Sequence, residues 1–298
     1  MNGIIVIDKQ SDFTSFDVIA IVRGILREKK IGHSGTLDPM ATGVLPVLVG
    51  KAAKAQDLLP DTDKEYEASF RLGITTDTLD ITGTVRTETS CSFTANDIES
   101  LLPRFRGDIM QIPPMYSAVQ KDGVRLYDLA RQGIEVEREA RPVHISELEL
   151  LSFDEKTQCG KLRIVCSKGT YIRVICDDIG KILGCGGVMT ALRRTKACGF
   201  TVEDAVTLAQ LQEMKNNDNI GSILRPVDSI FMCYRSVRIS EKQAVRYKNG
   251  ASLSMARLHM PKETADGELL RIYSGNEFLG LGTADKDSAE LKVRKNFI

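Results

Sequence analysis

A glycine-rich loop holds the first residues of this chain that could do chemistry. The stretch GHSGTLDPMATG spans residues 32–43 and contains three glycines, one of the chain's three histidines and the pair Asp38–Pro39. An Asp-Pro pair in a loop ordinarily forms an Asx-type turn, in which the aspartate bonds to the nearby backbone. The functional alternative is a catalytic carboxylate at Asp38. Few solubilising charges occur in this stretch, which is unusual for a connection between two elements.

Two further side chains are of a residue type that needs an explanation at their positions in the sequence. Tyr66 lies on the apolar face of an expected strand, where a tyrosine packed in the core is the ordinary interpretation. Arg173 follows Thr170, the expected N-cap of a helix, so a cation stands at the third helical position against the helix dipole. A carboxylate partner would explain it. Asp177, one turn later, is the local candidate, and a carboxylate from another loop is the functional one.

Several standard sites are excluded by their spacing. GVLPVLVGKA resembles a phosphate-binding loop, but six residues lie between its glycines and Ala52 replaces the magnesium-binding hydroxyl. GHSGT is no nucleophile elbow, because glycine directly follows Ser34. The histidines are scattered and the seven cysteines include no C-x-x-C pair, so neither a metal site nor a disulfide framework is expected. The chemistry should come from carboxylates, tyrosines and arginines.

The composition is that of an ordinary globular chain. It has 298 residues, of which 42% are hydrophobic and 27% charged, with 40 basic and 40 acidic side chains. A net charge of zero means that a nucleic-acid-binding surface, if there is one, must be local. The candidates are two clusters of cations, whose ordinary alternative is a solvated helix face. These clusters contain Lys29, Lys30, Arg193 and Arg194.

The sequence also favours a cytoplasmic protein. No apolar run is long enough to cross a bilayer, and MNGIIVIDKQ lacks the features of a secretory signal. An odd number of cysteines without paired spacing is typical of reduced, mostly buried thiols.

Helices and strands of mixed order are predicted around the candidate residues. Buried strands are expected at 3–8 and 43–50, the second with Pro46 at an edge or a bulge. Between them, Thr14 and Asp17 form a capping box at the start of a helix. Periodicity and turn residues predict the later elements. A half-buried strand is expected at 66–72, followed by a turn into a second strand, and a KDG turn is expected before a short helix that stops at Gly133. A strand at 162–167, a helix after Thr170 and short strands from about 236 on complete the prediction.

The run GHSGTLDPMATGVLPV resembles the signature loop of bacterial tRNA pseudouridine-55 synthases. The likeness continues through DKEYEASFRLGITTDTLDITG, RGDIMQIPPMYSAVQKDGVRLYDLARQGIEV and CSKGTYIRVICDDIGKILGCGGVMTALRRT. It covers about residues 3–230 in order and at similar spacing. Ser34 stands where threonine is frequent in the family, a change that keeps the hydroxyl.

The resemblance implies an α+β fold with two domains. A pseudouridine-synthase catalytic domain over 1–230 would have a mixed, mainly antiparallel central sheet flanked by helices and loops, with a tRNA-recognition insert at about 90–140. A small β-rich domain over 235–298 resembles the PUA-type RNA-binding module.

The resemblance also implies an activity: isomerisation of uridine 55 in the T-loop of tRNA to pseudouridine, on a base flipped out of its stack. No cofactor and no metal is expected. Asp38 would be the nucleophile, Arg173 would pair with it and keep it ionised, and Tyr66 would stack on the uracil. His33 would fill the position that the base vacates. The wall of the pocket would be completed by Tyr171 and Leu192.

The implied partner is the T-arm of tRNA, bound by a monomer that needs no protein partner and no membrane. Lys29, Lys30, Arg193 and Arg194 would contact RNA phosphates. Two alternatives stay open. One is the guide-RNA-dependent relative of archaea and eukaryotes, although the insert LLPRFRGDIMQIPPMYSAVQKDG resembles the standalone bacterial type. The other is an RNA-folding helper for which catalysis is secondary.

Overall fold

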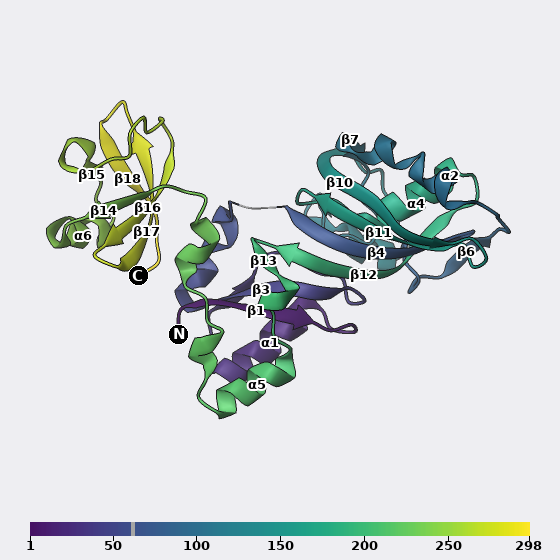
Figure 1. Cartoon of the computed structure of the whole chain (residues 1–298), viewed down its shortest axis with the longest axis horizontal. Helices are drawn as coiled ribbons and strands as arrows, with labels where there is room; N and C mark the ends of the chain where they lie inside the picture. Colours follow the sequence, from purple (N-terminus) through teal and green to yellow (C-terminus); the bar gives the residue numbers. More distant parts are fainter. Residues whose placement is uncertain (61–62) are drawn as a thin grey trace.

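The computed structural model describes residues 1–60 and 63–298, and within them the chain forms a large part and a smaller C-terminal part (Figure 1). In the described residues, the large part is built on a mixed sheet of nine strands. In chain order, these strands are β1 (Gly3–Lys9), β2 (Ile31–His33), β3 (Thr42–Val49), β4 (Lys64–Leu72), β7 (Gly107–Gln111), β10 (Arg141–Asp154), β11 (Cys159–Cys166), β12 (Gly187–Ala197) and β13 (Phe200–Thr201).

Strand β12 joins two halves of this sheet. The spatial order is β1-β3-β12-β4-β11-β10-β7, and all of these neighbours are antiparallel except β3 and β12. The parallel contact is short and pairs Thr42 with Arg193 and Gly43 with Arg194. Gly43 has φ +100°, and a Cβ there would lie 2.2 Å from the Arg194 carbonyl oxygen, so the crossing requires glycine. The α+β class with a mainly antiparallel sheet is confirmed.

Helices cover this sheet at positions that its sequence pattern predicts. Helix α1 (Ser15–Leu26) begins at the capping box formed by Thr14 and Asp17, as expected. Helix α4 (Ile172–Ile182) packs against β12, and α1 packs against α5 (Leu208–Asn216). The apolar faces of α1 and α4 and the inward side chains of the sheet form one hydrophobic core.

Strand β4 shows the half-buried alternation that was expected. Tyr66, Ala68, Phe70 and Leu72 are buried, while the residues between them are more exposed. The expected bulge at Pro46 is absent, because Pro46 lies in regular register with Val6 of β1. β3 is internal to the sheet, but on its other side the described strands pair only with residues 42–43 and 47–49, so Pro46 lies at a locally open edge. The carbonyl of Pro46 faces Ser34, just beyond the end of β2, so the missing donor falls where that pairing has stopped.

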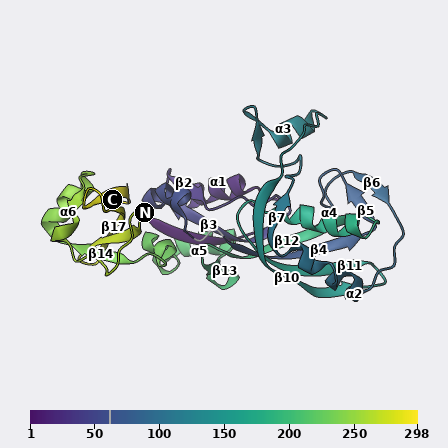
Figure 2. The ribbon, with the colours of Figure 1, turned by 90° about the horizontal axis from the view of Figure 1, so that it is seen from above.

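The predicted insert adds one strand, β7, to the edge of the sheet beside β10, and its later part stands out from the sheet. It contains α2 (Ala95–Glu99), β7, the small hairpin β8 (Gln120–Lys121) and β9 (Val124–Arg125), and α3 (Leu126–Arg131). Figure 2 shows α3 projecting away from the layers of the sheet. The short helix ends before Gly133 with φ +73°, which confirms the predicted stop. A second hairpin, β5 (Ile74–Thr76) with β6 (Val85–Glu88), follows β4.

The C-terminal part has its own sheet of five strands among the described residues, ordered β14-β16-β17-β18-β15. The β-rich character is confirmed, but helix α6 (Glu241–Lys248), capped by Ser240, was not expected. The elements of this sheet are β14 (Ser236–Ile239), β15 (Leu253–Ser254), β16 (Leu269–Ser274), β17 (Glu277–Asp285) and β18 (Glu290–Asn296).

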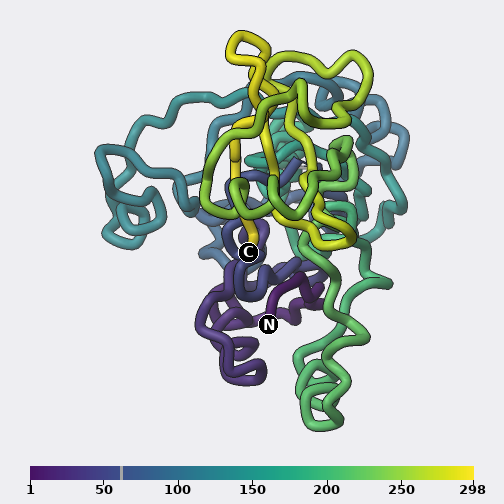
Figure 3. The backbone as a smooth tube through the Cα atoms, turned by 90° about the vertical axis from the view of Figure 1, so that its left-hand side faces the viewer, coloured from purple at the N-terminus to yellow at the C-terminus, as the bar shows by residue number. Residues whose placement is uncertain are grey.

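A cluster of aromatic rings joins the two parts. Phe231 lies 5.7 Å from Phe297 and 6.2 Å from Phe278 between ring centroids, and the cluster includes Ile4 and Val6 of β1. The two chain ends lie close together as a result, which the three views agree on (Figures 1, 2 and 3). The first strand is thus packed against the last residues of the chain.

Candidate active site

Asp38, Tyr66 and Arg173 come from three separate segments and line one open pocket of about 690 Å³. Asp38 lies in the loop between β2 and β3, Tyr66 on β4 and Arg173 in the first turn of α4. Two other predicted residues, Tyr171 and Leu192, line the same pocket. The sheet brings these segments together because β12 lies between β3 and β4.

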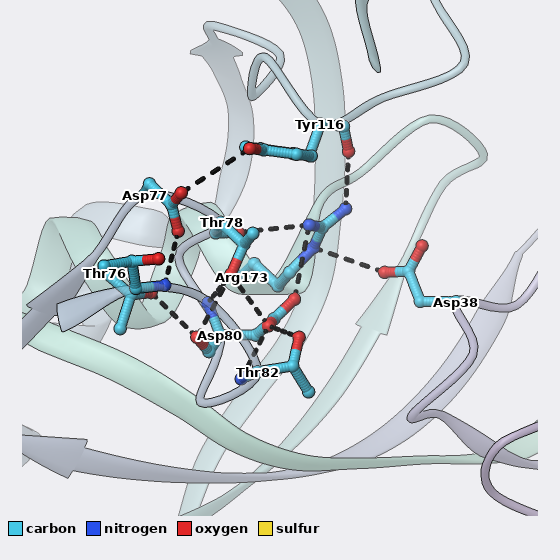
Figure 4. Close-up of polar contacts among 9 residues, drawn as sticks. Asp38, Thr76, Asp77, Thr78, Asp80, Thr82, Tyr116 and Arg173 are labelled. Carbon is cyan, nitrogen blue, oxygen red and sulfur yellow. Dashed lines mark hydrogen bonds and ion pairs between the residues drawn. The ribbon is translucent and has the colours of Figure 1, made fainter. Parts of the chain in front are cut away.

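The central contact is an ion pair between Asp38 and Arg173. The Nε of Arg173 lies 3.2 Å from Oδ2 of Asp38, and Figure 4 shows this carboxylate approaching the guanidinium from the loop. The Arg173 side chain is 6% exposed and that of Asp38 is 39% exposed, so the carboxylate faces both the buried cation and the open pocket. A charge-assisted contact of this kind attracts the carboxylate and fixes its orientation.

The structure excludes the local alternative for the partner of Arg173 and contradicts the expected N-cap. Asp177 is not its partner, because the Asp177 carboxylate pairs with Lys181 at 2.5 Å. Thr170 is not the N-cap: α4 starts at Ile172 after Tyr171, and the Thr170 hydroxyl donates to the Ser167 carbonyl instead. Arg173 is therefore the second residue of the helix. Its carboxylate partner comes from another loop, which is the functional alternative given above.

Arg173 is held by a second carboxylate that the sequence interpretation missed. Its NH1 lies 3.4 Å from Oδ2 of Asp80 and donates to the Thr78 carbonyl at 3.1 Å, while NH2 donates to the Tyr116 carbonyl at 3.0 Å (Figure 4). Asp80 is 6% exposed. The guanidinium is thus fixed on several sides, and its Nε is directed at Asp38.

Hydroxyl groups surround Asp80 in turn. Its Oδ1 accepts from the hydroxyls of Thr78 at 2.9 Å and Thr82 at 2.5 Å, and from the backbone N–H of Thr82 at 3.1 Å. The Thr76 hydroxyl donates to the Asp80 carbonyl at 2.7 Å. The signal for this arrangement was the dense set of hydroxyl and carboxyl groups in TTDTLDITG. Such a set satisfies a buried carboxylate without neutralising it.

Two buried cations support the backbone of the candidate loop. Lys9 is 0% exposed, and its Nζ donates to the carbonyls of Gln10 at 2.9 Å, Pro39 at 3.0 Å and Ala41 at 2.5 Å. Burial lowers the pKa of Lys9 to about 8, although the nearby Asp38 opposes this shift. The backbone on the far side of Asp38 is therefore anchored to β1.

Arg194 is the second of these cations, and its expected role as a phosphate contact is wrong. It is 0% exposed and donates to the carbonyls of Val44 at 2.7 Å, Gly35 at 3.2 Å and Thr36 at 3.4 Å. A guanidinium that is buried and bonded in this way cannot reach RNA. It shapes the loop from within the sheet.

The walls of the pocket are set by the central strands and by the insert. Tyr66 is 7% exposed, and burial raises the pKa of its phenol, which stays neutral at physiological pH. The backbone of Tyr171 is fixed at both its N–H and its carbonyl by the side-chain amide of Gln111, at 2.7 and 3.1 Å. Leu192 is 7% exposed, and Tyr127 of α3 lines the outer side of the same pocket.

His33 lies outside the lining of this pocket. Its ring is 9% exposed and meets the ring of Phe16 edge-on, with centroids 5.8 Å apart. Burial lowers the pKa of His33, so the imidazole is neutral at physiological pH. Within the described parts of the chain its Nδ1 has no hydrogen-bond partner. Its predicted wedge role stays a prediction.

The other predicted phosphate contacts lie on the surface. Lys29 and Lys30 are exposed after the end of α1. Arg193 is 40% exposed and forms a two-point ion pair with Asp8, at 2.9 and 3.1 Å. For these three residues the role remains a prediction. Residues 1–60 and 63–298 contain no group of three or more His, Cys, Asp or Glu placed to hold a metal ion.

The arrangement can carry out nucleophilic chemistry on a flat substrate. An ionised carboxylate with one face against a guanidinium and the other toward the pocket can attack an electrophilic carbon. The neighbouring neutral phenol offers an aromatic face for a base.

No helix in the described chain is long and apolar enough to span a bilayer.

Comparisons with known proteins agree on one family. Residues 23–172 match the profile of the TruB family pseudouridylate synthase N-terminal domain, and residues 173–232 match the tRNA pseudouridylate synthase B C-terminal domain. The protein named tRNA pseudouridine synthase B from Clostridium tetani is 41% identical to this chain, and the one from Clostridium perfringens ATCC 13124 is 42% identical. Each match covers 98% of this chain and 98% of the relative. The enzyme of that name from Pseudomonas aeruginosa UCBPP-PA14 is 41% identical over 96% of this chain and 93% of its own.

Solved structures show the same fold over nearly the whole chain. A Cbf5-Nop10-Gar1 complex contains a chain that superposes with a TM-score of 0.77 at 26% identity, covering 99% of this chain and 85% of that one. An H/ACA RNP bound to a substrate RNA containing 2'-deoxyuridine gives a TM-score of 0.74 at 25% identity, with coverage of 99% and 85%.

Proposed function

The chain belongs to the TruB family of pseudouridylate synthases, and on this premise we propose that it converts uridine 55 in the T-loop of tRNA into pseudouridine, with Asp38 as the nucleophile. The single observation that supports the site best is the 3.2 Å contact between Asp38 and Arg173 at the wall of a pocket that Tyr66 also lines.

The reaction needs an ionised carboxylate and a base that has left its stack. The N1–C1′ bond breaks, the base turns within the pocket, a C5–C1′ bond forms, and the proton on C5 is lost while N1 gains one. Asp38 attacks either the ribose or the base, and both routes require its charged form. Arg173 keeps that charge next to the pocket even when RNA excludes water from it.

Tyr66 and the insert would hold the flipped base. The Tyr66 ring is placed by β4, and its neutral phenol can stack on uracil without placing a second negative charge near Asp38. Tyr127 and Arg131 of α3 line the outer side of the pocket, so the insert at about 90–140 would contact the RNA that enters it. His33, the last residue of β2, lies beside Phe16 and would fill the vacated position in the RNA.

The partner is proposed to be the T-arm alone, bound by a monomer in the cytoplasm, where tRNA is found. Lys29, Lys30 and Arg193 are the surface cations that would contact its phosphates. We also propose a division into a catalytic domain over 1–230 and a PUA-like RNA-binding domain over 235–298. In support, the β14–β18 sheet begins at Ser236 and forms a hydrophobic core of its own.

Release of tritium from C5-labelled uridine in transcribed tRNA tests the activity. We expect release from tRNA and from an isolated T-arm hairpin, and no release when the T-loop uridine is changed to cytidine. Persistent release from the cytidine variant would place the target elsewhere. A requirement for added protein or guide RNA would favour the guide-dependent alternative.

The variant Asp38→Asn separates an enzyme from an RNA-folding helper. It removes the nucleophilic charge with little change in volume, so turnover should be lost while the Kd for the hairpin changes by less than about threefold. A variant that retains turnover would exclude Asp38 as the nucleophile. If tRNA still folds normally in cells that contain only this variant, the protein has a role beyond catalysis.

A further inference from the structure

Lys64 is a pocket residue to which the proposed reaction gives no role. It is the first residue of β4, and it lies on the same face as Tyr66, two residues further along. The strand register places it opposite Cys166 of β11. Its side chain is half-buried and lines the pocket that contains Asp38.

The ammonium group of Lys64 finds no hydrogen-bond acceptor within the described part of the chain. Over residues 1–60 and 63–298, no hydrogen bond or ion pair connects its Nζ to another group, although an ammonium carries three donors. Burial lowers the pKa of Lys64, and the neighbouring cations Arg194 and Lys168 act in the same direction. The thiols of Cys166 and Cys198 act in the opposite direction, and burial remains the largest cause. A partly buried ammonium without a bonded partner among these residues is unfavourable in the free protein.

The Lys64 ammonium lies beside the glycine-rich loop and between two hollows. A Cβ at Gly35 would lie 3.5 Å from the Lys64 Nζ and 3.8 Å from Arg194 NH1, so both cations approach the loop where it has no side chain. Beyond Gly35 lies a second hollow of about 460 Å³, lined by Ser34, Gly35 and Lys168 among others. Lys64 lines both hollows.

We propose that Lys64 binds a backbone phosphate of the substrate RNA, namely one of the two phosphates that flank the flipped uridine. This inference rests on the proposed function. If the uracil lies between Asp38 and Tyr66, the adjoining backbone must leave the pocket along its rim. Lys64 lines both this pocket and the neighbouring hollow, so it is placed to meet a backbone that runs from one to the other. A phosphate is the one group of a nucleotide that supplies a full negative charge to an ammonium.

A contact with a uracil carbonyl is the competing assignment, and the chemistry of the RNA distinguishes it. Replacing one phosphate by a methylphosphonate removes its charge and leaves the bases unchanged. A lysine that binds this phosphate loses its partner on such an RNA, whereas a lysine that binds the base does not.

The test measures the Kd of T-arm hairpins with a methylphosphonate 5′ or 3′ to the target uridine. All proteins carry Asp38→Asn, so that the RNA is not converted. With Lys64 present, one of the two modified hairpins should bind about tenfold more weakly than the unmodified one. Lys64→Met should lower the affinity for the unmodified hairpin by the same factor. The methylphosphonate should then cause no further loss of affinity in this variant. Lys64→Arg, which keeps the charge, should restore most of the affinity.

Lys161→Met is the matched control. Lys161 lies on the opposite face of the sheet, in register with Ser69, and pairs with Glu67 at 2.5 Å. This variant should respond to the methylphosphonates as the parent protein does. If Lys64→Met binds the unmodified hairpin normally, or remains sensitive to both modifications, the inference is wrong.

A stability measurement excludes a purely structural role. Because the Nζ of Lys64 has no hydrogen-bond or ion-pair partner among residues 1–60 and 63–298, Lys64→Met should have a Tm equal to or above that of the parent protein. A lower Tm together with no coupling to either phosphate would make Lys64 a structural residue. Tritium release by the wild-type protein is tested separately, so failure of the proposed function is recognised independently of failure at Lys64.

Discussion

Arg173 connects two carboxylates, because its Nε lies 3.2 Å from Asp38 and its NH1 lies 3.4 Å from Asp80. The two acids differ in setting. Asp80 is 6% exposed and bonded to threonine hydroxyls, whereas Asp38 is 39% exposed toward the pocket. One guanidinium therefore balances a buried charge and positions an accessible one.

Arg173→Met should reduce stability and turnover together. Removing the arginine leaves Asp80 as an uncompensated buried charge, which costs about 3–5 kcal/mol in comparable cases. Asp38 also loses the group that holds it. Urea denaturation should show the loss of stability. Arg193→Met is the control, since its exposed pair with Asp8 contributes about 0–1 kcal/mol. Equal stability of the two variants would contradict this account.

Arg194→Met should affect the loop and leave the salt dependence of RNA binding unchanged. Three backbone carbonyls lose a charged donor, each unsatisfied group costing about 1–3 kcal/mol, so the Tm and kcat should fall. The slope of log Kd against log salt should stay that of the wild type, because this cation is buried. Lys30→Met should give the reverse, with a smaller slope and an unchanged Tm. A changed slope for Arg194→Met would return this residue to the RNA surface.

Gly43→Ala should strongly destabilise the protein. A methyl group there would lie 2.2 Å from the Arg194 carbonyl oxygen, and the φ of +100° is unfavourable for alanine. Gly24 offers a matched control within α1, where a Cβ meets nothing within 4 Å. Gly24→Ala should raise stability by about 0.5–1 kcal/mol through helix propensity. The two changes are chemically identical, so similar thermal melts would disprove the close crossing of β3 and β12.

Lys9 predicts opposite effects of alkaline pH on activity and stability. The pKa of Lys9 is about 8 in the folded protein and near its ordinary value of 10.5 when unfolded. Between these values the unfolded chain holds a proton that the folded chain has released, so this residue makes stability rise with pH. Activity should decline with a midpoint near pH 8, because the loop carbonyls lose a charged donor.

Profiles of kcat/KM against pH, measured with denaturation curves at the same pH values, test the role of Lys9. Lys9→Met should be less active at every pH and should lack the decline near pH 8. If its alkaline limb matches that of the wild type, another group titrates there.

Features fixed by near neighbours could be predicted from the sequence. The capping box of Thr14, the alternation of β4 and the stop at Gly133 each depend on a few adjacent residues, and the structure confirms them. Helix α6 was missed because it is a single short helix among strand-like segments. The pairing of Arg173 with Asp38 followed only from the resemblance, since no local pattern links a helix to a distant loop.

The error at Arg194 has a simple physical origin. Arg193 and Arg194 were interpreted as a cationic cluster, but they lie on β12, where successive side chains point to opposite faces. Arg193 lies in register with Glu67 and is partly exposed, while Arg194 lies in register with Tyr66 and is buried. Asp80 was missed for a related reason, because its burial depends on a hairpin whose position the sequence does not specify.

The place of β12 has a consequence for how the protein is made. Until residues 187–197 leave the ribosome, β3 and β4 present open edges to one another with nothing between them. Before that point no strand joins the two halves of the sheet, and Asp38 and Tyr66 belong to different halves. Pairing of this late strand with both β3 and β4 brings the Asp38 loop and Tyr66 together, so the pocket cannot form until residues 187–197 have been synthesised.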